Sequence, residues 1–179
     1  MMVIDIGAAN TKVAIIEEGI MRSSHLINVG SQDVSLALSR AKGISMLQAE
    51  EIKREFGLPG DPNDGAVAEI TRLAVERIFS EANRLLTAYQ RAKRVNITRV
   101  ILSGGGAMLK GILDLAKNSF DTEVSLGASF EKVEAPANIE PILKDAPFIK
   151  SADYNYGSVA VFPLAIPSIA GPGAMLGVV

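Results

Sequence analysis

Apolar and small residues at the start of the chain follow a pattern that predicts a β-hairpin. Residues 3–6 and 12–16 are rich in β-branched side chains, and the small residues 7–11 separate them. Short β-branched runs around such a turn are typical of two antiparallel strands. Residues 25–29 have a similar composition and predict a third short strand.

Helical spacing of the apolar positions begins after this third strand. Ser31 can cap a helix that ends at Gly43, and a second helix starts near Ser45 and stops at Gly57. The Ser45-x-x-Gln48 spacing predicts a capping box, because the hydroxyl and the amide can each pair with a free backbone N–H at the helix start.

A loop rich in proline and glycine, residues 58–64, precedes a long helix from about residue 65 to 94. Within this helix apolar residues recur at helical spacing, and charged residues fill the other faces. The pattern then predicts a strand at 99–102, a glycine turn at 104–106, a helix at 107–119 and a strand at 123–126. The chain is therefore expected to fold as one piece that includes a β–turn–α–β unit.

The composition of the chain limits which binding partners and which cellular location are expected. The 179 residues suffice for one domain or for one lobe of a larger protein. A net charge of −2 does not favour nucleic acid or anionic lipid, so no nucleic-acid partner is expected. The absence of cysteine excludes disulfides and thiolate metal sites. The first residues lack the pattern of a secretory signal, and a cytoplasmic location is expected.

The apolar stretch at residues 159–179 raises the question of a membrane span. A spanning helix needs about 20 largely uninterrupted apolar residues. Pro163, Pro167 and Pro172 interrupt this stretch, and each proline lacks a backbone donor. We expect a buried helix followed by an irregular apolar tail.

The first candidate ligand site is the Asp5-x-Gly7 turn at the end of the first strand. It offers a carboxylate beside backbone N–H groups that small side chains leave uncovered, so a phosphate could approach closely. Asp and Gly at the end of a strand are more commonly only a turn. Taken alone, this motif favours the turn.

The second candidate is Glu50-x-x-Lys53, followed by Arg54, in the second helix. Residues three apart lie on the same helix face, where an ion pair contributes at most about 0.5 kcal/mol. The ordinary interpretation is a surface ion pair. In the functional interpretation, the Glu50 carboxylate accepts hydrogen bonds from the ribose hydroxyls of a nucleotide, and Lys53 and Arg54 flank its base.

The third candidate is the run Gly104, Gly105 and Gly106 between a strand and a helix, where free backbone N–H groups favour an anion or a polar ligand. Three glycines are costly in backbone entropy. Ligand approach would explain that cost, and so would close packing of the turn. The dinucleotide pattern G-x-G-x-x-G fails at Leu109, and no P-loop occurs in the sequence.

The order and spacing of the three motifs resemble the second lobe of the superfamily of actin, heat-shock chaperones and sugar kinases. Within it, residues 3–12, 49–53, 101–111 and 130–136 are similar to the PilM proteins of type IV pilus assembly. The related division protein FtsA shares the three motifs. The resemblance covers residues 3–164.

The resemblance implies an α/β fold, the actin-like ATPase (ribonuclease H-like) lobe: a mixed sheet with flanking helices and a smaller helical inserted subdomain. Residues 1–179 would form this single lobe, with 1–28 and 95–179 as the core sheet subdomain and 29–94 as the inserted subdomain. ATP and Mg²⁺ would be the cofactors of the complete two-lobed protein.

The resemblance also implies roles for individual residues. Asp5 would hold a magnesium-bound water or orient the attacking one. The donors to the β- and γ-phosphates would be Gly7, Ala8, Ala9 and Thr11. The nucleoside would be held by Glu50, Lys53 and Arg54, with Gly104, Gly105 and Gly106 behind the adenine and ribose.

In the family a first lobe supplies the other phosphate loop, and the sequence contains no second Asp-x-Gly hairpin. We therefore expect weak nucleotide binding and negligible hydrolysis by this chain alone. Implied partners are the first lobe, the cytoplasmic tail of an inner-membrane pilus assembly protein, and further copies in a homo-oligomer or filament. Attachment to the inner membrane would run through partners.

Three alternatives stay open from the sequence. They are an FtsA-like role in cell division, a small-molecule kinase or phosphatase of the same superfamily, and a passive binding module.

Overall fold

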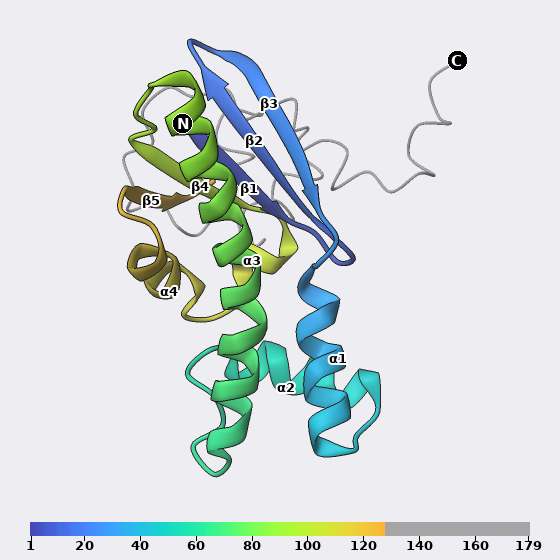
Figure 1. Cartoon of the computed structure of the whole chain (residues 1–179). Coiled ribbons are helices and arrows are strands. Elements are labelled where there is room, and N and C mark those ends of the chain that lie inside the picture. The colour runs from blue at the N-terminus through green and yellow to red at the C-terminus, as the bar shows by residue number, and fades with distance from the viewer. Residues whose placement is uncertain (128–179) are drawn as a thin grey trace, which may run out of the picture. The chain divides into compact units, whose positions relative to one another are not determined.

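The computed structural model describes residues 1–127, and Met1–Leu126 form one compact unit. Within this part of the chain the strands form one five-stranded sheet, in the order β3-β2-β1-β4-β5 (Figure 1). The strands are β1 (Met2–Ile6), β2 (Thr11–Glu17), β3 (Ile20–Ile27), β4 (Arg99–Ser103) and β5 (Glu123–Leu126). The first three form an antiparallel meander, while β4 pairs in parallel with β1 and β5 in parallel with β4. The sheet is therefore mixed, as predicted.

The helices are α1 (Ser31–Lys42), α2 (Met46–Phe56), α3 (Gly65–Lys93) and α4 (Ile112–Ser119), with a short 3₁₀ turn η1 (Gly105–Met108). The core joins Met2, Ile4 and Leu102 of the sheet to buried residues of the helices. All five residues of β1 are buried, as expected for a central strand with a parallel neighbour.

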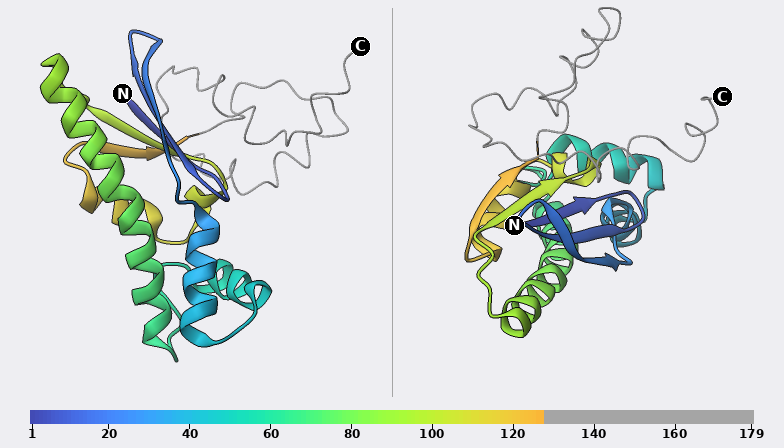
Figure 2. Two further views of the ribbon diagram at one scale, coloured as in Figure 1. Left: turned by 45° about the vertical axis from the view of Figure 1, so that its right-hand side comes forward. Right: turned by 90° about the horizontal axis from the view of Figure 1, so that it is seen from above.

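The long helix α3 connects the helical part of the unit to the sheet (Figures 1 and 2). It contacts α1 and α2 as well as α4. Its buried residues follow helical spacing, as expected for a face turned to the core, and they are Val67, Thr71, Val75, Ile78, Phe79, Ala82 and Leu86. Phe79 on this face packs edge-on against Phe120, with 5.5 Å between the ring centroids.

Most predicted elements are confirmed, and the Ser45–Gln48 capping box is present at the start of α2. The predicted third strand exists with other bounds: β3 spans Ile20–Ile27, so it begins before the predicted range 25–29 and Val29 lies outside it. Ser31 is not the N-cap of α1; Gly30 is. The backbone N–H of Gly30 donates to the Asp33 carboxylate at 2.8 Å, and the Asp33 N–H donates to the Gly30 carbonyl at 3.1 Å, so the helix start is closed without a side chain on the N-cap residue.

The single helix predicted for residues 107–119 is also wrong. The structure has the 3₁₀ turn η1, then a break at Gly111, then α4. Gly111 has φ of 82°, a left-handed conformation that ends one helical segment before the next begins. The apolar spacing runs across this break, and for that reason the pattern did not reveal it.

The predicted subdomains and the features predicted near the C-terminus extend beyond the residues that the structure describes. The division into a core sheet subdomain and an inserted helical subdomain stays a prediction, since it reaches residue 179. The motif at 130–136 and the expected helix and tail after residue 159 lie outside the described part. Within residues 1–127, none of the helices has both the length and the apolar composition for a membrane span.

Candidate functional site

The Asp5 turn and the glycine turn lie side by side because β1 and β4 are neighbouring parallel strands. Asp5 is paired with Ser103 in the register of these strands. A Cβ on Gly104 would lie 2.4 Å from Asp5 Oδ1 and 2.6 Å from the carbonyl oxygen of Ile6. Gly104 also has φ of 85°, so both its conformation and its surroundings require glycine.

The three glycines of this turn differ in what they contact. A Cβ on Gly106 would lie 2.3 Å from Ile6 Cγ2, so close packing accounts for Gly106 as it does for Gly104. Gly105 is exposed, and a Cβ there would meet no atom within 4 Å. Its φ is not positive either. Packing therefore explains two of the three glycines and leaves Gly105 without a reason within the described residues.

The hairpin between β1 and β2 is fastened to the start of α1. Backbone N–H groups of Ser31 and Gln32 donate to the carbonyl oxygens of Gly7 and Ala8, each at 2.9 Å. A Cβ on Gly30 would lie 2.3 Å from the same Ala8 oxygen. The first donors of α1, which in many proteins bind anions, are thus occupied by the hairpin itself.

The predicted phosphate-binding residues are not equally accessible. Ala8 and Ala9 are exposed at the tip of the hairpin. The backbone N–H of Gly7 donates to the Asn10 carbonyl at 3.0 Å. Thr11 is fully buried, and its hydroxyl donates to the Val29 carbonyl at 2.8 Å. The part of the hairpin open to a ligand is therefore its tip, and the Thr11 hydroxyl is used to hold the segment before α1.

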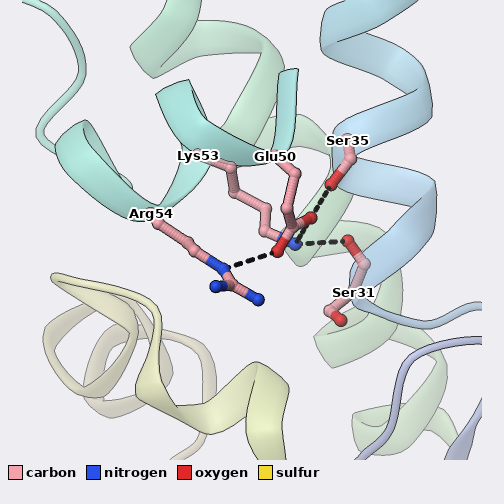
Figure 3. A network of polar contacts seen from close by, with 5 residues as sticks. All are labelled: Ser31, Ser35, Glu50, Lys53 and Arg54. Carbon is pink, nitrogen blue, oxygen red and sulfur yellow. Dashed lines mark hydrogen bonds and ion pairs between the residues drawn. The ribbon is translucent and has the colours of Figure 1, made fainter. Parts of the chain in front are cut away.

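The motif on α2 forms a network that reaches α1 (Figure 3). Glu50 Oε2 accepts from Ser35 Oγ and from Lys53 Nζ, each at 2.6 Å, and Oε1 accepts from Arg54 Nε at 3.0 Å. Lys53 Nζ also donates to the Ser31 carbonyl at 3.1 Å. The pair is therefore more than a surface ion pair within one helix, because it joins α2 to α1.

The charges in this network have different environments. Burial of the Glu50 carboxyl acts to raise its pKa, but the hydrogen bonds from Lys53 and Ser35, the Lys53 charge and the Arg54 hydrogen bond hold the pKa at about 2. Glu50 is therefore ionised at neutral pH. The Lys53 side chain is 8% exposed, whereas that of Arg54 is 78% exposed. Only Arg54 offers its charge freely to solvent or to a ligand.

The end of α2 is held against the segment that follows the glycine turn. The backbone N–H of Leu58 donates to the Lys110 carbonyl at 2.9 Å, and Lys110 Nζ donates to the Glu55 carbonyl. A Cβ on Gly57 would lie 2.7 Å from Lys110 Cβ. Contacts of the three sequence motifs, or of residues next to them in the chain, thus join the motifs into one assembly.

Sequence reasoning missed three residues of this assembly, Gly30, Ser35 and Lys110, and considered Ser31 only as a helix cap. Ser35 is fully buried next to Val34 on α1, and a polar residue at an apolar helix position is a signal that could have identified it. Nothing in the local pattern marks Lys110, since its contacts come from residues more than fifty positions earlier.

The metal prediction concerns Asp5 alone. Among residues 1–127, no group of three or more His, Cys, Asp or Glu side chains is placed to hold a metal ion. Mg²⁺ that arrives with a nucleotide takes most of its ligands from phosphate oxygens and water and needs only one or two carboxylates. Asp5, at the end of β1 beside the hairpin and the glycine turn, is compatible with that arrangement.

The mixed sheet with its flanking helices is the fold of an actin-like ATPase lobe. The family model described as "Cell division protein FtsA" matches residues 2–140, and the chain belongs to this family. A curated relative, the cell division protein FtsA of Neisseria meningitidis serogroup B (strain ATCC BAA-335 / MC58), is 26% identical over 150 residues. That match covers 72% of this chain and 36% of the relative, so the chain spans about a third of the relative's length.

Solved structures confirm the predicted fold class. The PilM–PilN type IV pilus biogenesis complex matches with a TM-score of 0.67 and 21% identity, over 79% of this chain and 40% of that one. EutJ, an ethanolamine utilization protein from Carboxydothermus hydrogenoformans, matches with a TM-score of 0.57 and 24% identity, over 70% of this chain and 43% of that one. MreB 5 of Spiroplasma citri bound to AMPPNP matches with a TM-score of 0.56 and 18% identity, over 70% of this chain and 47% of that one. At these identities the likeness concerns the fold.

Proposed function

We propose that this chain is the nucleotide-facing second lobe of an actin-like ATPase of the FtsA and PilM type. In the complete protein, ATP with Mg²⁺ binds between this lobe and a first lobe. The observation that carries the proposal is Gly105, an exposed glycine for which residues 1–127 show no requirement from packing or backbone conformation. Glycine at this exposed position leaves the backbone uncovered between strand β4 and the following turn, which allows a ligand to approach it closely.

The proposed roles follow the positions of the side chains. Ala8 and Ala9 at the hairpin tip are the phosphate contacts, and Asp5 holds a magnesium-bound water or orients the attacking one. Gly105, between Gly104 and Gly106, lies behind the adenine and ribose. Glu50 and Arg54 contact the nucleoside. Catalysis at such a site consists mostly of positioning and charge stabilisation.

The first candidate process is type IV pilus assembly in the cytoplasm. The motifs at residues 3–12 and 101–111 resemble those of PilM, and the PilM–PilN complex has the highest TM-score of the three structures compared. On this proposal the nucleotide state sets lobe closure and thereby affinity for the cytoplasmic tail of an inner-membrane pilus protein. Copies of the protein could also join in a homo-oligomer or filament.

The second candidate process is cell division. The description of the matching family and the Neisseria relative both support it. Co-purification separates the two candidates: a tagged two-lobed protein should retain the inner-membrane pilus protein in the first case and a division protein in the second. Asp5→Ala should abolish nucleotide binding and weaken retention. Unchanged retention by a variant that no longer binds ATP would support a passive scaffold instead.

The Gly105 observation has its own test. Gly105→Ala should weaken ADP binding by the two-lobed protein about tenfold, because the added methyl lies where the ligand approaches. Its urea unfolding curve should change little, since the methyl meets no protein atom. Gly65→Ala is the matched control, as Gly65 is also exposed with open space around it. If both variants bind ADP like the wild type, Gly105 is not a ligand contact.

A further inference from the structure

Strand β3 is the outermost strand on one side of the sheet (Figure 1). Among residues 1–127, β2 pairs with one side of β3 and no strand pairs with its other side. Backbone N–H and C=O groups along an open edge can pair with a further strand, and proteins commonly prevent this with Lys or Pro on the edge. β3 contains neither residue type. The described part of the chain therefore leaves one side of β3 open to a strand of a partner.

Exposed apolar side chains gather on this edge strand. Three of the six large apolar side chains that are exposed in residues 1–127 lie on β3, and each of the three is more than half exposed. They are Ile20, Met21 and Leu26. Apolar side chains along an open edge favour pairing with a strand of another chain, because the pairing removes them from water.

A β-bulge places two of these side chains on the same face of the sheet. Arg22 has no partner on β2, because the register of the two strands shifts by one residue at this point. Successive residues of a strand alternate between the two faces, and paired residues share a face. Met21 is paired with Ile16 and Leu26 with Lys12, four positions apart on β2. Met21 and Leu26 therefore lie on one face, although they are five residues apart on β3.

We propose that the open side of β3 pairs in antiparallel fashion with β3 of a second copy of this chain, with Ser24 of each copy opposite Ser24 of the other. A two-fold axis perpendicular to the sheet keeps each side chain on its own face, so only residues of the same face can lie opposite each other. In this register Met21 of each copy lies opposite Leu26 of the other. Ile20 of each copy lies opposite Ile27 of the other.

The neighbouring registers match less well. An axis one position away in either direction would place Met21 or Leu26 opposite the polar Ser24, whereas the proposed register joins apolar side chains to each other, which stabilises a strand pair. It also places no charges of like sign opposite each other. Arg22 is the residue of the bulge, and its guanidinium lies 3.8 Å from the Glu17 carboxylate of its own chain.

The pairing gives a surface and a symmetry to the homo-oligomer of the proposed function, and it does not involve the proposed nucleotide contacts. An isologous contact uses the same surface on both copies and closes as a dimer, whereas a head-to-tail contact continues as a filament. A result against the dimer therefore leaves the nucleotide site untouched, and a failure of nucleotide binding leaves the dimer untouched.

Sedimentation velocity of the 179-residue chain over a concentration series tests the dimer. We expect a weak dimer that is populated by about 1 mM, since one strand edge is smaller than a standard interface. Leu26→Lys should weaken it about tenfold, because the lost apolar pair occurs twice. Leu47→Lys is the matched control, as Leu47 lies on α2 and is 71% exposed. A wild type that stays monomeric, or equal weakening by both variants, overturns the proposal.

Paired charges test the register. Met21→Glu alone should weaken the dimer about tenfold, whereas Met21→Glu combined with Leu26→Lys should restore most of the affinity, since opposite charges then face each other twice. Added salt should weaken the dimer of the double variant and leave that of the wild type unchanged. A double variant that associates no better than either single variant contradicts the register centred on Ser24.

Hydrogen exchange of the β3 amides shows whether something else covers the strand. In the dimer, protection of these amides should rise with the concentration of the chain. If every β3 amide is protected while the wild type is monomeric, another segment of the same chain occupies the open side and the proposal is wrong.

Discussion

At the scale of single residues, the Glu50 carboxylate is a contact whose contribution to stability depends on pH. Its pKa is about 2 in the folded chain, below the value of about 4.3 for a free glutamate. Because the folded pKa is the lower one, the stabilisation is fully present above about pH 4.5 and is lost as the pH falls toward 2. Urea unfolding between pH 6 and pH 2.5 should therefore show the wild type losing its advantage over Glu50→Gln in this window.

The control for this prediction is Glu51→Gln, an exposed position on the same helix. Its stability should follow the wild type across the pH range. A constant difference between the wild type and Glu50→Gln from pH 6 to 2.5 would contradict the assigned pKa.

At the scale of elements, the contact between the β1–β2 hairpin and the start of α1 depends on Gly30. A Cβ at Gly30 would lie 2.3 Å from the Ala8 carbonyl oxygen and 2.6 Å from the Asn10 nitrogen. Gly30→Ala should therefore destabilise the chain by about 1–3 kcal/mol, which is the usual effect of forcing extra atoms into a packed contact. Urea unfolding measures this difference.

Gly65→Ala again provides the comparison, because Gly65 begins α3 with nothing within 4 Å of an added Cβ. That variant should be neutral or more stable by up to about 1 kcal/mol. Hydrogen exchange adds a local readout. In Gly30→Ala the amides of Ser31 and Gln32, which donate to the hairpin, should exchange faster than in the wild type. Unchanged protection would mean that the contact tolerates the methyl.

At the scale of the whole molecule, the proposed function gives this chain one side of a two-sided site. It spans 36% of the Neisseria FtsA and 40% of the matched chain in the PilM–PilN complex. A cleft with one wall cannot exclude water or hold the γ-phosphate from both sides. Isolated, the 179-residue chain should release no phosphate above background and bind ATP in the millimolar range. A dissociation constant in the micromolar range or below would contradict this view.

Features that depend on neighbours in sequence were predictable from the sequence. The Ser45–Gln48 capping box and the β1–β2 hairpin are local, since the groups that interact lie within a few residues of one another. The strand at Glu123–Leu126 has the predicted bounds. The break at Gly111 was not predictable, because the apolar spacing continues across it and only the backbone conformation reveals it.

In the candidate site, too, some features follow from the sequence and others only from the folded structure. The sequence by itself determined which residue types are present: the Asp5 turn, the Glu50 motif and the glycine run, in an order that resembles actin-like lobes. Only the tertiary structure decided that Gly104 and Gly106 serve packing while Gly105 does not, and that Lys53 lies inside the α1–α2 contact. The physical reason is distance along the chain. Asp5 meets Gly104 because β1 and β4 pair, and Glu50 meets Ser35 because α1 packs on α2, and these contacts exist only after the chain has folded.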